Sequence, residues 1–358
     1  MRRRNPGTRR RVALMAAADL LAFGVALCVF AYFHHVRQPQ VEPTTLPTPP
    51  QAVSQQTPQP ASGTEQPAAQ ATPAPGETPV SSEAPAVTPD PNDLLGGKYA
   101  EKFSTAGVVS DETCYRSDKV ALEFRQEQRF DSLVHIIDIY IRDVHSLRTN
   151  LCQQVFGDRK SIRSLPELLP GALAISSSDQ YSNRNSSIWG LLVSNGLGYS
   201  SDTDIFDFAV LFLDGTMEVY EAGQADYDSL VSRGIYQAWT FGPVIVKDGA
   251  APDNYDGAPD YIANKNPRVA IGYCEPGHYY LVMVDGTRAS ESGSAGATLE
   301  ELSSLFLELG CTQALNLDGG STVAMSFGGR VLNTSTRDLS SVIYLCEPDA
   351  PDAGGNGA

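Results

Sequence analysis

ALNLDGGSTVAMSFGGRVLN, residues 314–333, is the stretch of sequence that says most about the fold. A short apolar strand ends at Asn316-Leu317-Asp318-Gly319-Gly320, and the chain then resumes as a hairpin with a Gly328-Gly329 turn. A plain turn needs only one glycine, whereas two in a row let another backbone or a ligand come close to the chain. The stretch therefore predicts a strand end at a close approach, and it leaves open whether Asp318 closes a loop or does chemistry.

Runs of β-branched and aromatic residues predict a strand-rich domain around this stretch. Strands are expected at 120–124, 133–144, 189–193, 242–246, 268–273, 279–285, 312–317 and 341–345, with a hairpin over 209–221 that turns at Asp214-Gly215. One helix should start at Thr298, which forms a capping box with Glu301, and stop at Gly310; a shorter one should cover 226–233. Many strands with few helices predict an α+β domain on a large, mainly antiparallel sheet.

The chain before this domain has a different composition. Residues 1–11 hold six arginines, and residues 12–33 form an apolar run of the length that crosses a bilayer as one transmembrane helix. The run is longer than the core of a cleaved signal peptide and lacks a small-residue cleavage site. We therefore expect an uncleaved anchor in the plasma membrane, with a cytoplasmic N-terminus and an extracellular C-terminal domain; a cleaved export signal is the alternative.

The remaining boundaries also follow from composition. Residues 38–93 are rich in Pro, Thr, Gln, Ala and Ser with almost no large apolar residues, which predicts a disordered stalk. Residues 94–348 are expected to form one domain, and 349–358 a disordered tail. The formal net charge of −16 argues against a nucleic-acid partner, which would require a basic face.

Cysteines and histidines give weaker signals. Cys114 and Cys152 flank one predicted pair of strands and are candidates for a bridge, although connectivity cannot be read from sequence. No cysteine spacing typical of structural zinc occurs. The histidines at 135, 145 and 278 show neither metal-ligand nor triad spacing, so we interpret them as structural.

Polar groups at three strand ends are the candidates for chemistry. Arg268 enters the strand at 268–273, Asp285 ends the strand that begins at 279, and Asp318 ends the strand that begins at 312. If the last two strands lie side by side, the two carboxylates point into one cleft, as glycoside cleavage requires. Arg268 or Arg184 would then hold a phosphate through forked hydrogen bonds. The plainer alternative makes Asp285 a turn residue, like Asp214, and Arg268 a surface ion pair.

At these residues the sequence resembles the phosphodiester glycosidase family. The resemblance rests on NPRVAIGY (266–273), EPGHYYLVMVDG (275–286) and ATLEELSSLFLELGCTQALNLDGGSTVAMSFGGRVLN (297–333), and it covers about residues 115–346. It implies hydrolysis of a sugar 1-phosphodiester in a cell-surface or cell-wall glycan, which releases the sugar and leaves a phosphomonoester. The sequence shows no required cofactor; a divalent cation between the acidic chain and a phosphorylated glycan is an alternative.

The resemblance also implies roles for particular residues. Asp318 is the central carboxylate and Asp285 its partner, and the residues expected to bind substrate are Arg184, Arg268, Asp179, Asn316, Gly319, Gly320 and Thr322. The chain departs from the family pattern where Ser176-Ser177 replace Asn-Gly and where Val323 replaces a serine. Two hypotheses therefore stand: an enzyme, or a degenerate member of the family that binds wall glycan. Which carboxylate is the acid, and whether a metal takes part, stay open.

Overall fold

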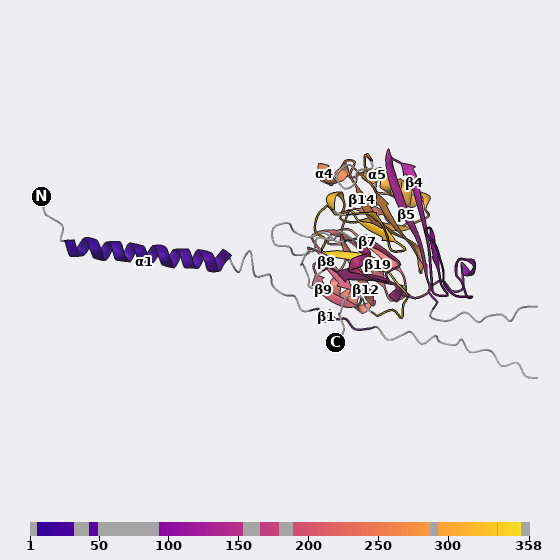
Figure 1. Ribbon diagram of the computed structural model, residues 1–358, viewed down its shortest axis with the longest axis horizontal. Coiled ribbons are helices and arrows are strands. Elements are labelled where there is room, and N and C mark those ends of the chain that lie inside the picture. Colours follow the sequence, from indigo (N-terminus) through magenta and orange to yellow (C-terminus); the bar gives the residue numbers. More distant parts are fainter. Residues whose placement is uncertain are drawn as a thin grey trace, which may run out of the picture.

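The computed structural model describes residues 6–31, 43–48, 93–152, 165–178, 189–286, 293–334 and 336–351. Within these ranges the protein is built on three sheets, and all paired strands are antiparallel (Figure 1). The prediction of mainly antiparallel strands with few helices is thus confirmed.

Each sheet has a defined strand order. The six-stranded sheet runs β1(Thr44–Thr45)-β9(Leu197–Ser201)-β8(Leu191–Ser194)-β12(Ile235–Phe241)-β10(Asp207–Phe212)-β11(Met217–Tyr220). The eight-stranded sheet runs β13(Val244–Val246)-β16(Gln313–Asn316)-β14(Arg268–Glu275)-β15(His278–Val284)-β5(Ser132–Ile141)-β4(Val120–Arg129)-β3(Cys114–Arg116)-β2(Val109–Ser110). The five-stranded sheet runs β18(Arg330–Asn333)-β17(Met325–Phe327)-β7(Ala174–Ser177)-β19(Ser341–Leu345)-β6(Leu147–Leu151).

The expectation of one large sheet is wrong, for a reason that lies in packing. Twisted open sheets rarely exceed about ten strands before they split and pack on one another. The main core lies where the three sheets meet and draws side chains from each, such as Leu281, Trp239 and Ile343. A second core covers the other face of the eight-stranded sheet, where Phe306 and its neighbours on α5 (Leu299–Glu308) pack.

The helices form where their capping residues predict. Thr298 caps α5, and its side chain and that of Glu301 make both hydrogen bonds of the capping box. Asp226 caps α3 (Tyr227–Ser232) through the backbone N–H of Ser229. Two other short α-helices are α2 (Leu165–Leu168) and α4 (Asp260–Ala263), and 3-10 turns lie at Ala100–Lys102, Val144–Ser146 and Gly320–Thr322.

The N-terminal helix α1 (Pro6–Ala31) stands apart from the sheets in Figure 1. No helix of the described residues is long and apolar enough to cross a membrane, and the anchor expected at 12–33 is not shown.

Two segments expected to lack structure make contacts where the structure describes them. Within the expected stalk, β1 adds to the edge of the six-stranded sheet, with Thr44 opposite Gly198. Leu46 follows β1 and packs on the apolar cluster beneath that sheet. Arg148 donates to the carbonyl of Ala350 within the expected tail at 2.9 Å, and to that of Pro348 just before it at 2.6 Å. Backbone groups at a sheet edge and a buried guanidinium both need partners, and these segments supply them.

The bridge suggested between Cys114 and Cys152 is absent. All six cysteines lie in described residues, and none is in a disulfide. Cys114 starts β3 in the eight-stranded sheet, whereas Cys152 follows β6 in the five-stranded sheet. The strands between these cysteines, β4 and β5, pair with each other in the eight-stranded sheet, but the two cysteines themselves lie in different sheets.

Candidate functional site

The predicted catalytic strand ends meet at one edge of the eight-stranded sheet. β14 pairs antiparallel with β15 on one side and with β16 on the other. The carboxyl ends of β15 and β16, which precede Asp285 and Asp318, therefore lie beside the start of β14 at Arg268. The condition for a shared cleft, that these two strands lie side by side, is not met, because β14 separates them by two strand spacings, or about 10 Å.

Asp285 is buried between two sheets. Its side chain is 5% exposed, and Oδ1 accepts a 2.7 Å hydrogen bond from Nδ2 of Asn333, the last residue of β18. Its Oδ2 lies 3.5 Å from Nε2 of His135 on β5. The backbone N–H of Asp285 donates to the carbonyl of Leu133. Asp285 is therefore no hairpin-turn residue: its carboxylate joins the eight-stranded sheet to the five-stranded one.

His135, which the sequence analysis interprets as structural, faces Asp285 and so borders the candidate site. Its ring is 1% exposed, lies nearly parallel to Phe124, and has Nδ1 3.0 Å from Nε2 of Gln126. When the Gln126 amide donates to Nδ1, the ring proton resides on Nε2, the atom that faces Asp285. Among the described residues Nε2 has no hydrogen-bond partner. A histidine inside the otherwise mostly apolar run LVHIIDIY is the sequence signal for this contact.

Asp318 lies at a close approach of two backbones, and its side chain is half-buried. A Cβ on Gly319 would come within 2.6 Å of the carbonyl oxygen of Pro267. Gly320 adopts a φ of +65° and donates its N–H to that same carbonyl at 2.8 Å. The two glycines therefore let the chain pass against Pro267, which holds Asp318 at the sheet edge.

Thr322 and Asn316 fix the backbone on either side of Asp318. The Thr322 hydroxyl donates to the carbonyl of Gly319 at 2.6 Å, and the residue is 1% exposed. The fully buried Asn316 donates from Nδ2 to the carbonyl of Gly242 at 2.7 Å. Its Oδ1 is buried without a hydrogen-bond partner among the described residues.

Arg268 is buried at the start of β14 and binds main-chain oxygens. Nε donates to the carbonyl of Ala297 at 3.0 Å, and Nη2 donates to the carbonyls of Ile262 and Asn264. Burial lowers the pKa of the guanidinium to about 10. Because the described contacts engage Nε and Nη2, Arg268 has only Nη1 left to offer a phosphate, rather than a fork.

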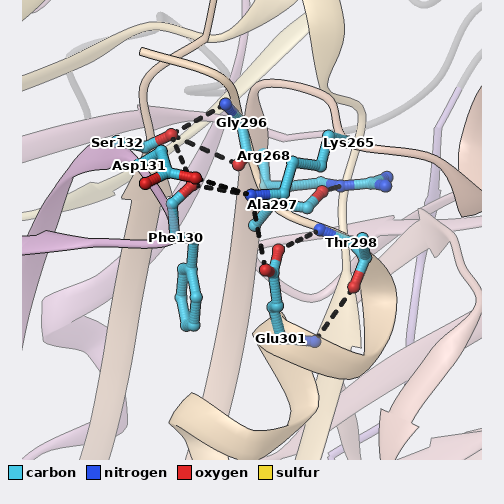
Figure 2. Close-up of polar contacts among 9 residues, drawn as sticks. All are labelled: Phe130, Asp131, Ser132, Lys265, Arg268, Gly296, Ala297, Thr298 and Glu301. Carbon is cyan, nitrogen blue, oxygen red and sulfur yellow. Dashed lines mark hydrogen bonds and ion pairs between the residues drawn. The ribbon is translucent and has the colours of Figure 1, made fainter.

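The segment that returns from the loop after Asp285 is anchored close to Arg268 (Figure 2). Ser132 and Gly296 exchange hydrogen bonds at 2.8 and 3.2 Å. Lys265 donates to the carbonyl of Phe130 at 2.9 Å and lies 3.4 Å from Glu301 of the capping box. These contacts join the turn between β4 and β5 to the start of α5.

The serines that replace the family's Asn-Gly are engaged in the fold. Ser177 on β7 accepts from the N–H of Ala324 at 3.2 Å, and the Ser176 hydroxyl donates to the carbonyl of Ser177. The carbonyl of Ser178 accepts from the N–H of Asp318 at 3.0 Å. Asp179 and Arg184 lie outside the described residues, but the chain enters their segment from this bond to Asp318.

A groove of about 690 Å³ adjoins this edge. Gly242, Pro243 and Ile262 line it, and the same residues accept hydrogen bonds from Asn316 and Arg268. Aromatic side chains from three segments also line it: Phe206, Phe241 and Tyr255. Its size and mixed apolar and polar lining suit a small-molecule or sugar ligand. The described residues hold no group of three or more His, Cys, Asp or Glu side chains suited to a metal ion.

Comparison with known proteins agrees with this architecture. Residues 171–346 match the family model for phosphodiester glycosidases, and the chain carries a domain of that family. The family resemblance seen in the sequence is thus confirmed.

Individual relatives add detail. The chain is 32% identical over 191 residues to an uncharacterized SPbeta prophage-derived protein, YomE, of Bacillus subtilis (strain 168). The match spans 52% of this chain but only 29% of that relative.

Two solved structures are similar. One is the catalytic domain of zebrafish N-acetylglucosamine-1-phosphodiester alpha-N-acetylglucosaminidase, auto-inhibited by its pro-peptide, with a TM-score of 0.50 and 14% identity. That match covers 64% of this chain and 83% of the zebrafish chain, and at this identity it shows the fold alone. The other is a hypothetical protein from Synechocystis, with a TM-score of 0.43, 14% identity, and coverage of 68% and 64% of the two chains.

Proposed function

We propose that this protein hydrolyses a sugar 1-phosphodiester in a cell-surface glycan, releasing the sugar and leaving a phosphomonoester. The family domain over residues 171–346 supports the reaction class. The observation that carries the proposal is the meeting of Asp285, Asp318 and the start of β14 at one sheet edge beside an aromatic-lined groove.

The two carboxylates take different roles in this proposal because their surroundings differ. Asp318 is half-buried and meets the sugar, where it stabilises or attacks the anomeric carbon, or activates the attacking water. Asp285 is almost fully buried and acts through His135, which faces it at 3.5 Å. The departing phosphomonoester has a second pKa of about 6, so the leaving oxygen needs less protonation than a sugar hydroxyl would.

The phosphate is held near the start of β14. Nη1 of Arg268 is one donor for it, and Arg184, whose segment begins next to Asp318, is the second. Asp179, which follows Ser178 in the sequence, completes the proposed sugar-binding set, and Asn316 holds the backbone before Asp318 through Gly242. Gly319, Gly320 and Thr322 shape the pocket by fixing the backbone of Asp318.

We place this domain outside the cytoplasm, tethered to the plasma membrane through residues 12–33 and a stalk. The proposal is supported by the basic residues 1–11 that precede an apolar run, and by exposed apolar side chains along α1 such as Leu20, Leu21 and Phe23. The lipid bilayer and a cell-wall glycan are then the partners.

A specific observation favours a second candidate, a glycan-binding protein without turnover. Ser176 and Thr322 stand at positions where the family supplies other polar groups, and both hydroxyls donate to carbonyls of the protein itself. Arg268 is likewise bonded to three carbonyls. A domain with these groups committed to its fold retains the groove, which alone suffices for binding.

The test incubates the full chain with the N-acetylglucosamine 1-phosphate diester of a mannoside, and separately with phosphate-linked wall glycans. Free reducing sugar is followed for the wild type and for Asp318→Asn, and glycan binding is measured on both. Release by the wild type that is lost in the variant supports the enzyme. Binding by both proteins without release on any substrate would reject the enzyme and favour the binder.

A further inference from the structure

Two cysteines far apart in sequence meet at the end of the eight-stranded sheet away from Arg268. Cys274 lies near the end of β14, and Cys311 follows the turn that ends α5. Their Sγ atoms are 3.6 Å apart. A disulfide bond is about 2.05 Å long. The two sulfur atoms therefore need to approach by less than about 2 Å, which rotation of the side chains can supply.

A bulge in the backbone of β14 directs the Cys274 side chain toward Cys311. The register of β14 against β15 shifts between Tyr273 and Glu275, so Cys274 is the extra residue of a β-bulge. Bulges redirect a side chain that would otherwise follow the alternation of the strand. Cys274 also contacts the carbonyl of Leu309 at 3.8 Å, which places it against the last turn of α5.

Charged neighbours activate one thiol of the pair. His278 Nε2 lies 2.9 Å from Oδ1 of Asp138, and the His278 ring is stacked on Tyr140. The hydrogen bond with Cys311 and the nearby His278 lower the pKa of Cys274 to about 6 against the opposing effect of burial. Burial alone would lower the pKa of His278, but Asp138 and Cys274 outweigh it and raise that pKa to about 9.

The second thiol has the opposite character. Cys311 is 2% exposed, and its hydrogen bond with Cys274 and its burial raise its pKa far above the usual range. One half-buried reactive thiolate beside a buried thiol is the arrangement of an attacking and a resolving cysteine.

We propose that Cys274 and Cys311 form a dithiol–disulfide site. The Cys274 thiolate attacks one sulfur of a small disulfide such as oxidised glutathione and expels one thiolate. The Cys311 sulfur then attacks the Cys274 sulfur and expels the second thiolate, which takes up the proton that Cys311 loses. The protein loses two hydrogens, and the oxidant is reduced to two thiols. This inference stands apart from the proposed glycosidase activity, because it uses none of that site's residues.

The bond would close a loop of 37 positions that carries β15, Asp285 and α5. A loop of this size is stabilised mainly because the cross-link restricts the unfolded chain. We expect the oxidised protein to melt about 5–15 °C above the reduced protein.

The experiment treats the reduced full chain with oxidised glutathione and maps the products by mass spectrometry. Wild type and the control Cys114→Ser should each lose two hydrogens and yield a linked peptide pair containing Cys274 and Cys311. Cys311→Ser should instead hold glutathione on Cys274. Stable glutathione adducts on Cys274 or Cys311 of the wild type, a bridge from either of them to another cysteine, or no reaction at the pair would overturn the proposal.

Two measurements keep the test decisive if Cys311→Ser does not fold. On the wild type at pH 6, iodoacetamide should modify Cys274 about tenfold faster than Cys114, whose pKa is raised by burial. Equal rates would overturn the assignment of Cys274 as the attacking thiol. The second measurement is native mass spectrometry of the reduced chain with added Zn²⁺. Stoichiometric zinc bound by this pair would overturn the proposal and indicate a metal site instead.

Discussion

Asp214 and Asp318 both end a strand and both precede a glycine, yet the fold uses them differently. Asp214 sits at the tip of the β10–β11 hairpin, where Oδ1 accepts from the N–H of Thr216 at 2.9 Å and from its hydroxyl at 2.6 Å. Asp318 sits where the chain after β16 passes against Pro267. One dipeptide pattern therefore serves a local turn in one place and a junction of distant segments in the other.

The glycines that follow these two aspartates also differ in the reason for which the fold needs them. Gly215 has a φ of +80°, and an added Cβ would meet only the tip of the Leu94 side chain. Gly319 has an ordinary extended φ, and its Cβ would meet a carbonyl oxygen of Pro267. The first glycine is required by its own conformation and the second by a neighbour. Glycine identity alone therefore does not reveal which aspartate lies at a site.

The largest expected difference between the two aspartates is in catalysis. Asp318→Asn should lower the rate of sugar release about 10²–10⁴-fold, the usual contribution of a carboxylate in acid–base chemistry. Asp214→Asn should leave the rate unchanged, because that side chain bonds only within its own turn. Initial rates with the phosphodiester substrate make the comparison. Equal rates in the two variants would remove the functional difference between the two turns.

Substitution of the two glycines should lower the stability of the protein by different amounts. Gly319→Ala places a methyl group 2.6 Å from a backbone oxygen that cannot swing away, and should cost about 2–4 kcal/mol. Gly215→Ala places an alanine in a left-handed backbone conformation and displaces the flexible side chain of Leu94. It should lower the free energy of unfolding by about 1–2 kcal/mol. Urea unfolding of the full chain measures both. A larger loss for Gly215→Ala would contradict the close-approach interpretation of Gly319.

The third prediction compares the partners of the aspartates. Asn333→Ala removes the donor to the buried Oδ1 of Asp285, and should cost about 1–3 kcal/mol because that oxygen loses its hydrogen bond away from water. Thr216→Ala at the Asp214 turn should cost less than about 1 kcal/mol, because solvent replaces the lost bond. Equal losses in urea unfolding would show that Asp285 is less sequestered than its burial indicates.

The smallest effect concerns pH. Asp111 repeats the Asp214 pattern, and hydrogen bonds from the backbone and side chain of Thr113 lower its pKa to about 2 from 3.8. Because the folded pKa is depressed, its stabilising contribution is complete above about pH 4 and is lost as the pH falls toward 2. An NMR titration of the Asp111 carboxyl should show this value. Thr113→Ala should move the pKa upward, and no movement would show that a different contact lowers it.

Much of the fold could be read from local pattern. The capping box at Thr298 and Glu301, the hairpin over 209–221 and the strand at 341–345 appear where the sequence predicts them. These features depend on neighbours within a few residues, so sequence reasoning can reach them. The family resemblance likewise rests on ordered motifs along the chain and is confirmed over residues 171–346.

The candidate site was only partly predictable. Asp285 and Asp318 were placed at strand ends, and the structure brings both to one edge, but the strand between them was not foreseen. No motif in the sequence links His135 to Asp285, although the structure places Nε2 of the one 3.5 Å from Oδ2 of the other. Arg268 was expected to hold a phosphate through a fork, whereas the carbonyls that surround it come from three other positions in the chain.

The sequence by itself determined the strand-rich composition of the domain, its turns and helix caps, and the family to which residues 171–346 belong. Only the tertiary structure decided that the strands divide into three sheets, that Asp285 joins two of them, and that Cys274 meets Cys311. The reason is physical. Turns and caps are hydrogen-bonded within a few residues, whereas a buried carboxylate or thiol takes its chemistry from whichever distant segment packing brings against it.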